Sequence, residues 1–371
     1  MARPVKLLSL IVLAFVAVGL LLSPRIGVAR PIPMAKALLV RDGEQPGCRA
    51  EDLNAAPFAA PSKVHRWGTV VVGCYKSSHA QLEEWDLYAG RVLRTVKLPT
   101  PPDDNQIRVA RGAGHLAVVL ADALQGGGNP RLLLLDDAFK LDKSWDLKGS
   151  MDYADIAADG ALAVVAGRGQ TGMRVVVLDL AHERIVARRA VSFGRAPIFA
   201  AYDHPEQVVR VHKKDIFIAM HVRSTLRVLR LDRKLQTRAV HARHSRDAYV
   251  GYGAGQYWLA LDRGEPVLQV RGKVYTLHRD LGHATLLRSS AHGQPRWAIS
   301  PTGQVATEDG RIAASKGAPF VRALRYTNEV VVRGMKREIR ANATRYVFWA
   351  FGRAVIVRSA MSVGITAIQP R

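Results

Sequence analysis

Two histidines near the middle of the chain have a spacing found in metal sites. His241 and His244 are three residues apart, and Asp247 follows closely. On a helix this spacing presents two ligands on one face. The surrounding stretch, HARHSRD, is also typical of a polar turn with solvated basic side chains. We favour the turn, so the sequence predicts no metal site.

Catalytic signatures are absent from the sequence. It contains no GxSxG, HExxH, glycine-rich phosphate loop or EF-hand motif. Asp103 and Asp104 follow two prolines and are better suited to a turn than to acid–base chemistry. We therefore assign no catalytic residue, predict no cofactor, and leave enzymatic activity open while favouring a protein without it.

Glycine-rich loops that contain single basic residues are stronger candidates for a binding site. Glycine lets a ligand approach the backbone closely. The glycines concerned are Gly126, Gly127, Gly128, Gly167, Gly169 and Gly172, and the basic residues are Lys76, Arg168, Arg223 and Arg263. If these loops share one face, the four cations form a rim that favours an anionic ligand or an acidic partner. The alternative is that these loops are ordinary turns.

The elements that must position these loops are short apolar strands that recur along the chain. Several strands end in an aspartate, at Asp86, Asp136, Asp179 and Asp232, with steps of 50, 43 and 53 residues. A second series, a turn followed by a strand, starts near residue 68 and repeats about every 40 to 55 residues, the period of propeller blades. No helical pattern follows residue 30. The sequence thus predicts an all-β fold, a β-propeller with seven four-stranded blades; six or eight blades are the alternatives.

In this blade pattern the basic and glycine-rich loops join the second strand of a blade to the third. The predicted loops are 75–80, 121–130, 166–173, 220–226 and 261–266. The stretch EEWDLYAGRVLRTVKLP, residues 83–99, has the order strand, aspartate, glycine-containing turn, strand. It resembles the repeat of secreted bacterial propellers of the YVTN or WD-repeat-like type. That resemblance implies a propeller over residues 65–371, with its first four blades matched best.

A lead-in over residues 30–64 precedes the predicted propeller. Its segment 35–40, AKALLV, is a candidate strand for completing the last blade, because an open ring leaves sticky edge strands. Only two cysteines occur, Cys48 and Cys74. In an oxidising compartment we expect them to form a disulfide that ties the lead-in to the first blade. Two buried free thiols are the alternative.

The first 29 residues have the features of a secretory signal peptide. Arg3 and Lys6 precede a run of 16 residues without charge, from Leu7 to Leu22, and small residues end at Ala29. The run is shorter than the roughly 20 residues of a typical membrane span, and an uncleaved N-terminal anchor is the alternative. We therefore expect export to the periplasm or the cell exterior, with membrane attachment only through such an anchor.

The whole chain is strongly basic, with 54 Lys and Arg against 31 Asp and Glu, a net charge of +23 and a pI near 10.5. Such an excess favours polyanionic partners, although charge spread over a soluble surface is an alternative interpretation. Residues 223–246 are the most basic stretch. Export argues against nucleic acid as the partner, and aromatic residues, only 7%, do not interleave with this stretch for base stacking.

Three functions remain open from the sequence. The first is an exported, non-enzymatic propeller that binds a protein or an anionic polymer of the cell envelope. The second is a propeller enzyme, such as a hydrolase, a lyase or a quinoprotein-like dehydrogenase, with its site in the central mouth. The third is a basic structural scaffold of the envelope. Propellers perform all three roles, so the fold alone does not choose between them.

Overall fold

The computed structural model describes the residues within 54–76, 79–99, 105–122, 130–148, 151–169, 173–191, 208–222, 225–244, 257–262, 264–270, 273–282, 284–289, 298–299, 305–306, 320–323, 329–333, 338–342, 344–351, 353–359 and 363–368. All of their regular secondary structure is β-strand. The chain is a β-propeller, as the sequence predicts; the number of blades stays a prediction. The first two predicted segments, the signal peptide and residues 35–40, lie outside the described residues.

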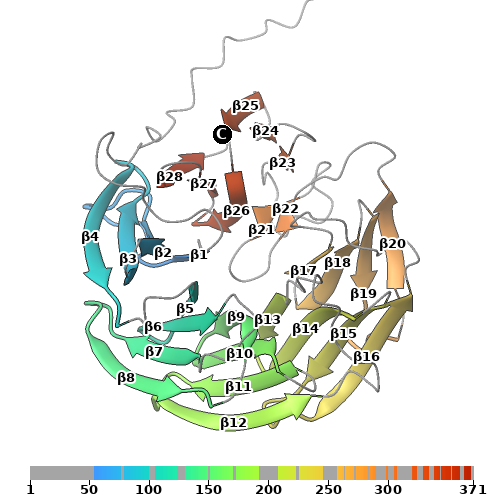
Figure 1. Ribbon diagram of the computed structural model, residues 1–371. Helices are drawn as coiled ribbons and strands as arrows, with labels where there is room; N and C mark the ends of the chain where they lie inside the picture. The colour runs from blue at the N-terminus through green and yellow to red at the C-terminus, as the bar shows by residue number, and fades with distance from the viewer. Residues whose placement is uncertain are drawn as a thin grey trace, which may run out of the picture. The chain divides into compact units, whose positions relative to one another are not determined.

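Five four-stranded antiparallel sheets follow one another along the chain, and we name them sheets I to V (Figure 1). Sheet I contains β1 (Asn54–Pro57), β2 (Thr69–Lys76), β3 (His79–Asp86) and β4 (Arg91–Lys97). Sheet II contains β5 (Asn105–Gly112), β6 (His115–Asp122), β7 (Arg131–Leu135) and β8 (Leu141–Asp146). Sheet III contains β9 (Asp152–Asp159), β10 (Leu162–Arg168), β11 (Met173–Asp179) and β12 (Arg184–Val191).

Sheet IV contains β13 (Val208–His212), β14 (Asp215–Val222), β15 (Thr225–Leu231) and β16 (Thr237–His244). Sheet V contains β17 (Tyr257–Asp262), β18 (Glu265–Val270), β19 (Lys273–Leu277) and β20 (Ala284–Ser289). Smaller sheets follow: β21 (Ala298–Ile299) with β22 (Val305–Ala306), then β23 (Phe320–Ala323), β24 (Glu329–Arg333) and β25 (Glu338–Asn342), then β26 (Thr344–Ala350), β27 (Arg353–Ser359) and β28 (Val363–Ile368). Since β1 starts at Asn54, the first sheet begins within the predicted lead-in.

Each sheet is a simple up-and-down meander, so its strands differ in environment. The first strands β1, β5, β9, β13 and β17 lie next to one another in that order. The third strands are almost wholly buried: in β7 every residue after Arg131 is buried. The fourth strands are exposed: in β8 every residue is exposed except Trp145, which is half-buried. The near-continuous apolar runs of the inner strands fit this burial on both faces.

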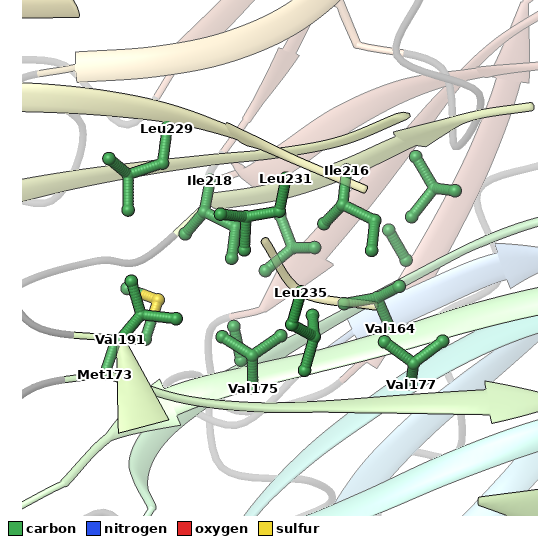
Figure 2. Close-up of a cluster of buried hydrophobic side chains, with 14 of the residues drawn as sticks. Val164, Met173, Val175, Val177, Val191, Ile216, Ile218, Leu229, Leu231 and Leu235 are labelled. Atoms are coloured by element: carbon green, nitrogen blue, oxygen red, sulfur yellow. The ribbon is translucent and has the colours of Figure 1, made fainter. Parts of the chain in front are cut away.

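Apolar side chains fill the space between successive sheets. Between sheets III and IV, Val164, Val175 and Val177 face Ile216 and Leu231 (Figure 2). The same kind of layer separates sheets I and II, II and III, and IV and V. A further cluster joins the two ends of the described chain. Ala55, Trp67, Val70, Val72 and Trp85 of the first sheet and its first connection pack with Ala350, Val355, Ile365 and Ala367 of the last.

A glycine at this last contact has a steric role. Gly68 has φ +87°, and an added Cβ would lie 2.6 Å from the Ala59 carbonyl oxygen and 2.7 Å from the Phe351 ring. The backbone conformation and the crowding both exclude a side chain at this position. The first sheet can therefore approach the last sheet closely.

The five sheets repeat a backbone irregularity that the sequence does not announce. Each fourth strand contains a β-bulge at the same place, shortly after its turn. The residues left unpaired are Leu93, Asp142, Val186, Arg238 and Leu287. A bulge bends the strand and redirects its side chains, and this position carries an apolar residue in three sheets and a charged one in sheets II and IV.

Candidate functional site

Of the four predicted rim cations, the structure describes the backbone positions of two, Lys76 and Arg168. Lys76 ends β2 and Arg168 ends β10, so both stand where a second strand turns into a third, as predicted. Arg223 lies outside the described residues. The prediction for 261–266 is wrong, because this loop joins the first and second strands of sheet V, where Asp262 pairs with Glu265. In a meander that hairpin lies at the opposite edge from the β2–β3 and β10–β11 turns, and Arg263 itself lies outside the described residues.

Of the six predicted glycines, the structure describes two, Gly167 and Gly169. Gly126, Gly127, Gly128 and Gly172 lie outside the described residues, and Gly169 follows β10 directly. Gly167 is a residue of β10 rather than of a loop, and a Cβ there would lie 2.9 Å from the Cβ of Met151. Gly167 therefore serves close packing between β10 and the start of β9, not the approach of a ligand.

The histidine pair and the cysteines have clearer positions. His241 and His244 both lie in β16, an extended strand. A strand does not place residues three apart on one face as a helix does, so the helical spacing argument for a metal site does not apply here. Cys74 lies in β2, whereas Cys48 is outside the described residues. The disulfide stays a prediction.

The repeated aspartates form hydrogen bonds within turns. Asp86 Oδ1 accepts hydrogen bonds from the backbone N–H groups of Tyr88 and Ala89 at 2.8 and 2.9 Å. The side chains of Asp136, Asp179 and Asp232 accept the same kind of bond in the next three sheets. An aspartate at this position stabilises the turn before the fourth strand.

The buried carboxylates of the first sheet are also structural. Glu84 accepts hydrogen bonds from Thr69 Oγ1 at 2.7 Å and Arg94 Nε at 2.7 Å. Glu83 accepts one from Trp85 Nε1 at 3.1 Å. Buried charges persist only when they are paired or hydrogen-bonded, and these are. The Glu83–Asp86 stretch therefore resembles a catalytic cluster in sequence but stabilises its own sheet.

A group of charged side chains lies instead on the first strands of three neighbouring sheets. Arg108 is in β5, Asp155 in β9 and Arg210 in β13. Arg210 Nη1 is 3.8 Å from Asp155 Oδ2, and the same oxygen accepts the Val209 backbone N–H at 2.8 Å. We name these three side chains the first-strand triad. In a propeller the first strands surround the central channel, so this is the position where a ligand meets all the sheets.

The first-strand triad carries more positive than negative charge in a secluded setting. The side chains of Arg210 and Asp155 are only 16% and 18% exposed. Burial raises the pKa of Asp155 above its ordinary value, although Arg210, the Val209 N–H and Arg108 oppose that rise. Burial also lowers the pKa of Arg210, against the attraction of Asp155. Both directions show that these charges are held with little solvent.

The hydrogen-bonding capacity of the two arginines is only partly used. Arg210 Nη1 donates to the Val209 carbonyl at 2.6 Å, and Arg108 Nη1 donates to the Ile107 carbonyl at 3.3 Å. Within the described part of the chain, the buried Nε of Arg210 has no acceptor. A guanidinium offers five donors in a rigid fork suited to carboxylate and phosphate. Arg210 therefore keeps a donor that no described acceptor uses.

Sequence analysis missed this triad because its members are far apart and lie within strands. Arg108 and Arg210 alternate with apolar residues, in IRV and VRV, which indicates a strand with one polar face. The sequence does not show which residues of other sheets lie opposite this polar face, because that depends on how the sheets are arranged around one another. The short Val-Arg-Val pattern on a first strand was the available signal.

Comparisons with known proteins support the fold and go no further. No protein-family model matches the chain, and no curated protein matches it. Among solved structures, a chain of Kuenenia stuttgartiensis hydrazine synthase is 13% identical with a TM-score of 0.51, covering 88% of this chain and 97% of that one. The Dos1 propeller has a TM-score of 0.47 at 11% identity, covering 82% and 76%. A structure of BBS1N in complex with ARL6DN has 0.49 at 12% identity, covering 90% and 97%.

Within the described residues, no helix has the length and apolar character needed to cross a membrane.

Proposed function

We propose that this protein is an exported β-propeller that binds an anionic partner, a protein or an envelope polymer, through acidic groups received at the first-strand triad. The observation that supports this most is that the secluded Arg210 pairs with Asp155 while Arg108 also acts electrostatically on the same carboxylate. Arginine stays charged at any physiological pH, so among the three triad residues one positive charge exceeds the single carboxylate, and an added anion would balance it. The excess of 54 basic over 31 acidic residues raises the encounter rate with such a partner.

The triad favours a localised acidic group over a diffuse coat of counterions. Charges with little solvent around them are screened less than surface charges. A carboxylate or phosphate that reached Arg210 would bring an acceptor to its Nε, which has none in the described residues. Charge-assisted bonds of this kind are about twice as strong as neutral ones.

Retention on heparin across a salt gradient tests the proposal. The test variant is Arg108→Gln with Arg210→Gln; the matched control is Arg184→Gln with Arg188→Gln, two exposed arginines of β12. Both variants lose the same charge. We expect the triad variant to elute at clearly lower salt than the control. Equal elution shows a diffuse basic coat and rejects the triad as the site. Arg210→Lys, which keeps the charge, checks that any loss is not misfolding.

Export and the disulfide belong to the same proposal and have their own test. A cleaved signal would remove Met1 from the mature chain, and the periplasm would oxidise Cys48 and Cys74. N-terminal sequencing of the protein from the envelope fraction should begin after Ala29. Thiol labelling of the denatured, unreduced protein should find no free cysteine. A retained Met1 supports the anchor, and two labelled thiols remove the disulfide.

A further inference from the structure

Three potential metal ligands converge where sheets II and III meet. His115 begins β6, Asp142 lies in β8, and Glu183 lies in the turn between β11 and β12. One ligand atom of each lies within 4.8 Å of the others. His115 Nε2 is 3.3 Å from Glu183 Oε1 and 3.9 Å from Asp142 Oδ2. We name these three residues and Lys143 the II–III junction.

The hydrogen bond made by Nδ1 of His115 determines which ring nitrogen carries the proton and therefore whether Nε2 is available as a ligand. His115 Nδ1 is 3.1 Å from the Ala113 carbonyl oxygen. A carbonyl only accepts hydrogen bonds, so Nδ1 carries the proton, and in the neutral ring Nε2 presents a lone pair. That lone pair faces two carboxylates, which also only accept. A backbone carbonyl on the second ring nitrogen is the usual partner of a metal-binding histidine.

The II–III junction has a net negative charge, which a bound cation would neutralise. Lys143 Nζ is 3.0 Å from Glu183 Oε2, so one carboxylate oxygen is neutralised while Oε1 still faces His115. With neutral His115, two carboxylates and one ammonium give a net charge of −1. The side chains of His115, Asp142 and Glu183 are 17%, 28% and 34% exposed, so the group lies at the surface and only the histidine is largely covered.

The backbone is arranged so that these side chains meet. Asp142 is the bulged residue of sheet II, left unpaired between Leu141 and Lys143. In a regular strand Asp142 and Lys143 would point to opposite faces, but here both reach the same group. Three ligands from three chain segments fit a metal with about 2.0–2.2 Å bonds, which requires ligand separations of about 3.4 Å.

From this geometry we infer that the II–III junction binds a divalent transition-metal ion through His115 Nε2, an oxygen of Asp142 and Oε1 of Glu183. Lys143 keeps Glu183 Oε2 as an outer hydrogen bond. The mixed imidazole and carboxylate set suits Zn²⁺ or Mn²⁺ and not Ca²⁺, which takes six to eight oxygens. Because the ligands come from two sheets, the ion links sheet II to sheet III.

Zn²⁺ binding to the full chain, measured by isothermal titration at pH 7.5, tests the inference. We expect Asp142→Asn and His115→Gln to lower the affinity for Zn²⁺ by at least about tenfold. The control Asp146→Asn removes an exposed carboxylate from the same strand, one that pairs with Arg131, and should leave Zn²⁺ binding unchanged. Equal binding by all four proteins overturns the proposal.

Thermal unfolding provides a second readout that does not depend on the number of other zinc sites. Zn²⁺ should raise the Tm of the wild type and of Asp146→Asn but not of His115→Gln, since a ligand that binds only the folded state stabilises it. Without metal, the variants should unfold cooperatively, which excludes misfolding as the cause of lost binding. If Ca²⁺ raises the Tm of the wild type as much as Zn²⁺ does, the junction is a nonspecific acidic patch and the inference fails.

Discussion

The II–III junction and the corresponding contact between sheets IV and V share two positions, the first residue of the second strand and the turn before the fourth strand of the next sheet, but carry opposite charge patterns. His115 begins β6 and Asp215 begins β14, each directly after the first hairpin of its sheet. Between IV and V, Asp215 Oδ1 accepts Arg230 Nε at 3.0 Å, and Oδ2 accepts Arg279 Nε at 2.7 Å. We name Asp215, Arg230 and Arg279 the IV–V junction. One carboxylate there has two guanidinium partners.

This difference shows that the negative charge at this position of the repeat can be fully compensated by protein side chains alone, as between sheets IV and V, or can remain in excess, as between sheets II and III. The carboxylate of Asp215 is 4% exposed and bonded on both oxygens, so the IV–V junction stabilises the fold. The II–III junction has two carboxylates, one lysine and a histidine whose free nitrogen faces acceptors. It is therefore suited to an exchangeable cation. The following experiments test this contrast, starting with the largest expected effect.

Asp215→Asn is expected to have the largest effect. It removes the charge that compensates Arg230 and Arg279 while keeping the shape of the side chain. Loss of one partner from a buried ion pair costs about 3–5 kcal/mol, and the partial exposure of both arginines places this case near 3. Urea unfolding should show that loss of stability. A change below about 1 kcal/mol would mean that the IV–V junction is no more structural than the II–III junction.

Arg230→Gln should cost less, about 1 kcal/mol, because Arg279 still pairs with Asp215. Arg230 also donates to the Arg279 carbonyl at 3.2 Å, so its loss removes one bond across the two sheets. In a double-mutant cycle with Arg279→Gln, we expect the two losses not to add. The measurement is the midpoint of urea unfolding for both single variants and the double variant. Additive losses would show that the two arginines act independently.

Acid should affect the II–III junction through Glu183. The hydrogen bond from Lys143 lowers the pKa of Glu183 below its ordinary value of 4.5. A lowered folded-state pKa contributes stability that is complete above 4.5 and is lost as the pH falls through the lowered pKa. The Tm of the wild type should therefore exceed that of Glu183→Gln at pH 7 and converge with it below pH 4. A gap that persists in acid would exclude this charge as its cause.

The smallest effect is expected from a single hydrogen bond between β12 of sheet III and the β15–β16 turn of sheet IV, which is separate from the Arg210–Asp155 pair that also joins these two sheets. Arg189 Nη1 donates to the Leu235 carbonyl at 2.9 Å. A single bond from an exposed side chain contributes about 0.5–1.5 kcal/mol, so Arg189→Gln should lower stability by an amount near the lower limit. Thermal unfolding is the measurement. A loss as large as that for Asp215→Asn would show that inter-sheet hydrogen bonds, and not buried charge, dominate these contacts.

The sequence predicted the repeat well because its physical cause is local. Alternating and continuous apolar runs indicate strands, and an aspartate at a strand end indicates a turn that its own side chain can stabilise. The four aspartates from Asp86 to Asp232 each accept a backbone N–H in such a turn. The exposed, basic character of β12 likewise follows from the pattern of its own residues.

The sequence assigned loop 261–266 to the wrong hairpin for a reason that is also physical. Where the repeat pattern is weak, the sequence does not show which strand of a blade is the first. If the strand order is wrong by one, a predicted hairpin is placed at the opposite edge of the sheet. The apolar packing between the first and last sheets is also not visible in the sequence, because it joins segments that are far apart in the chain. The contact of Val70 and Trp85 with Val355 and Ile365 joins residues separated by most of the chain.

By itself the sequence determined the all-β class, the strand repeat, the chemistry of the turns and the basic charge of the chain, because each depends on neighbours in the chain. The tertiary structure alone decided which charged residues meet. Arg108, Asp155 and Arg210 come together because first strands of successive sheets are adjacent. His115, Asp142 and Glu183 converge because a bulge redirects Asp142 and the next sheet brings its turn within reach. A side chain's type is set by its codon, but its partners are set by packing between elements far apart in the chain.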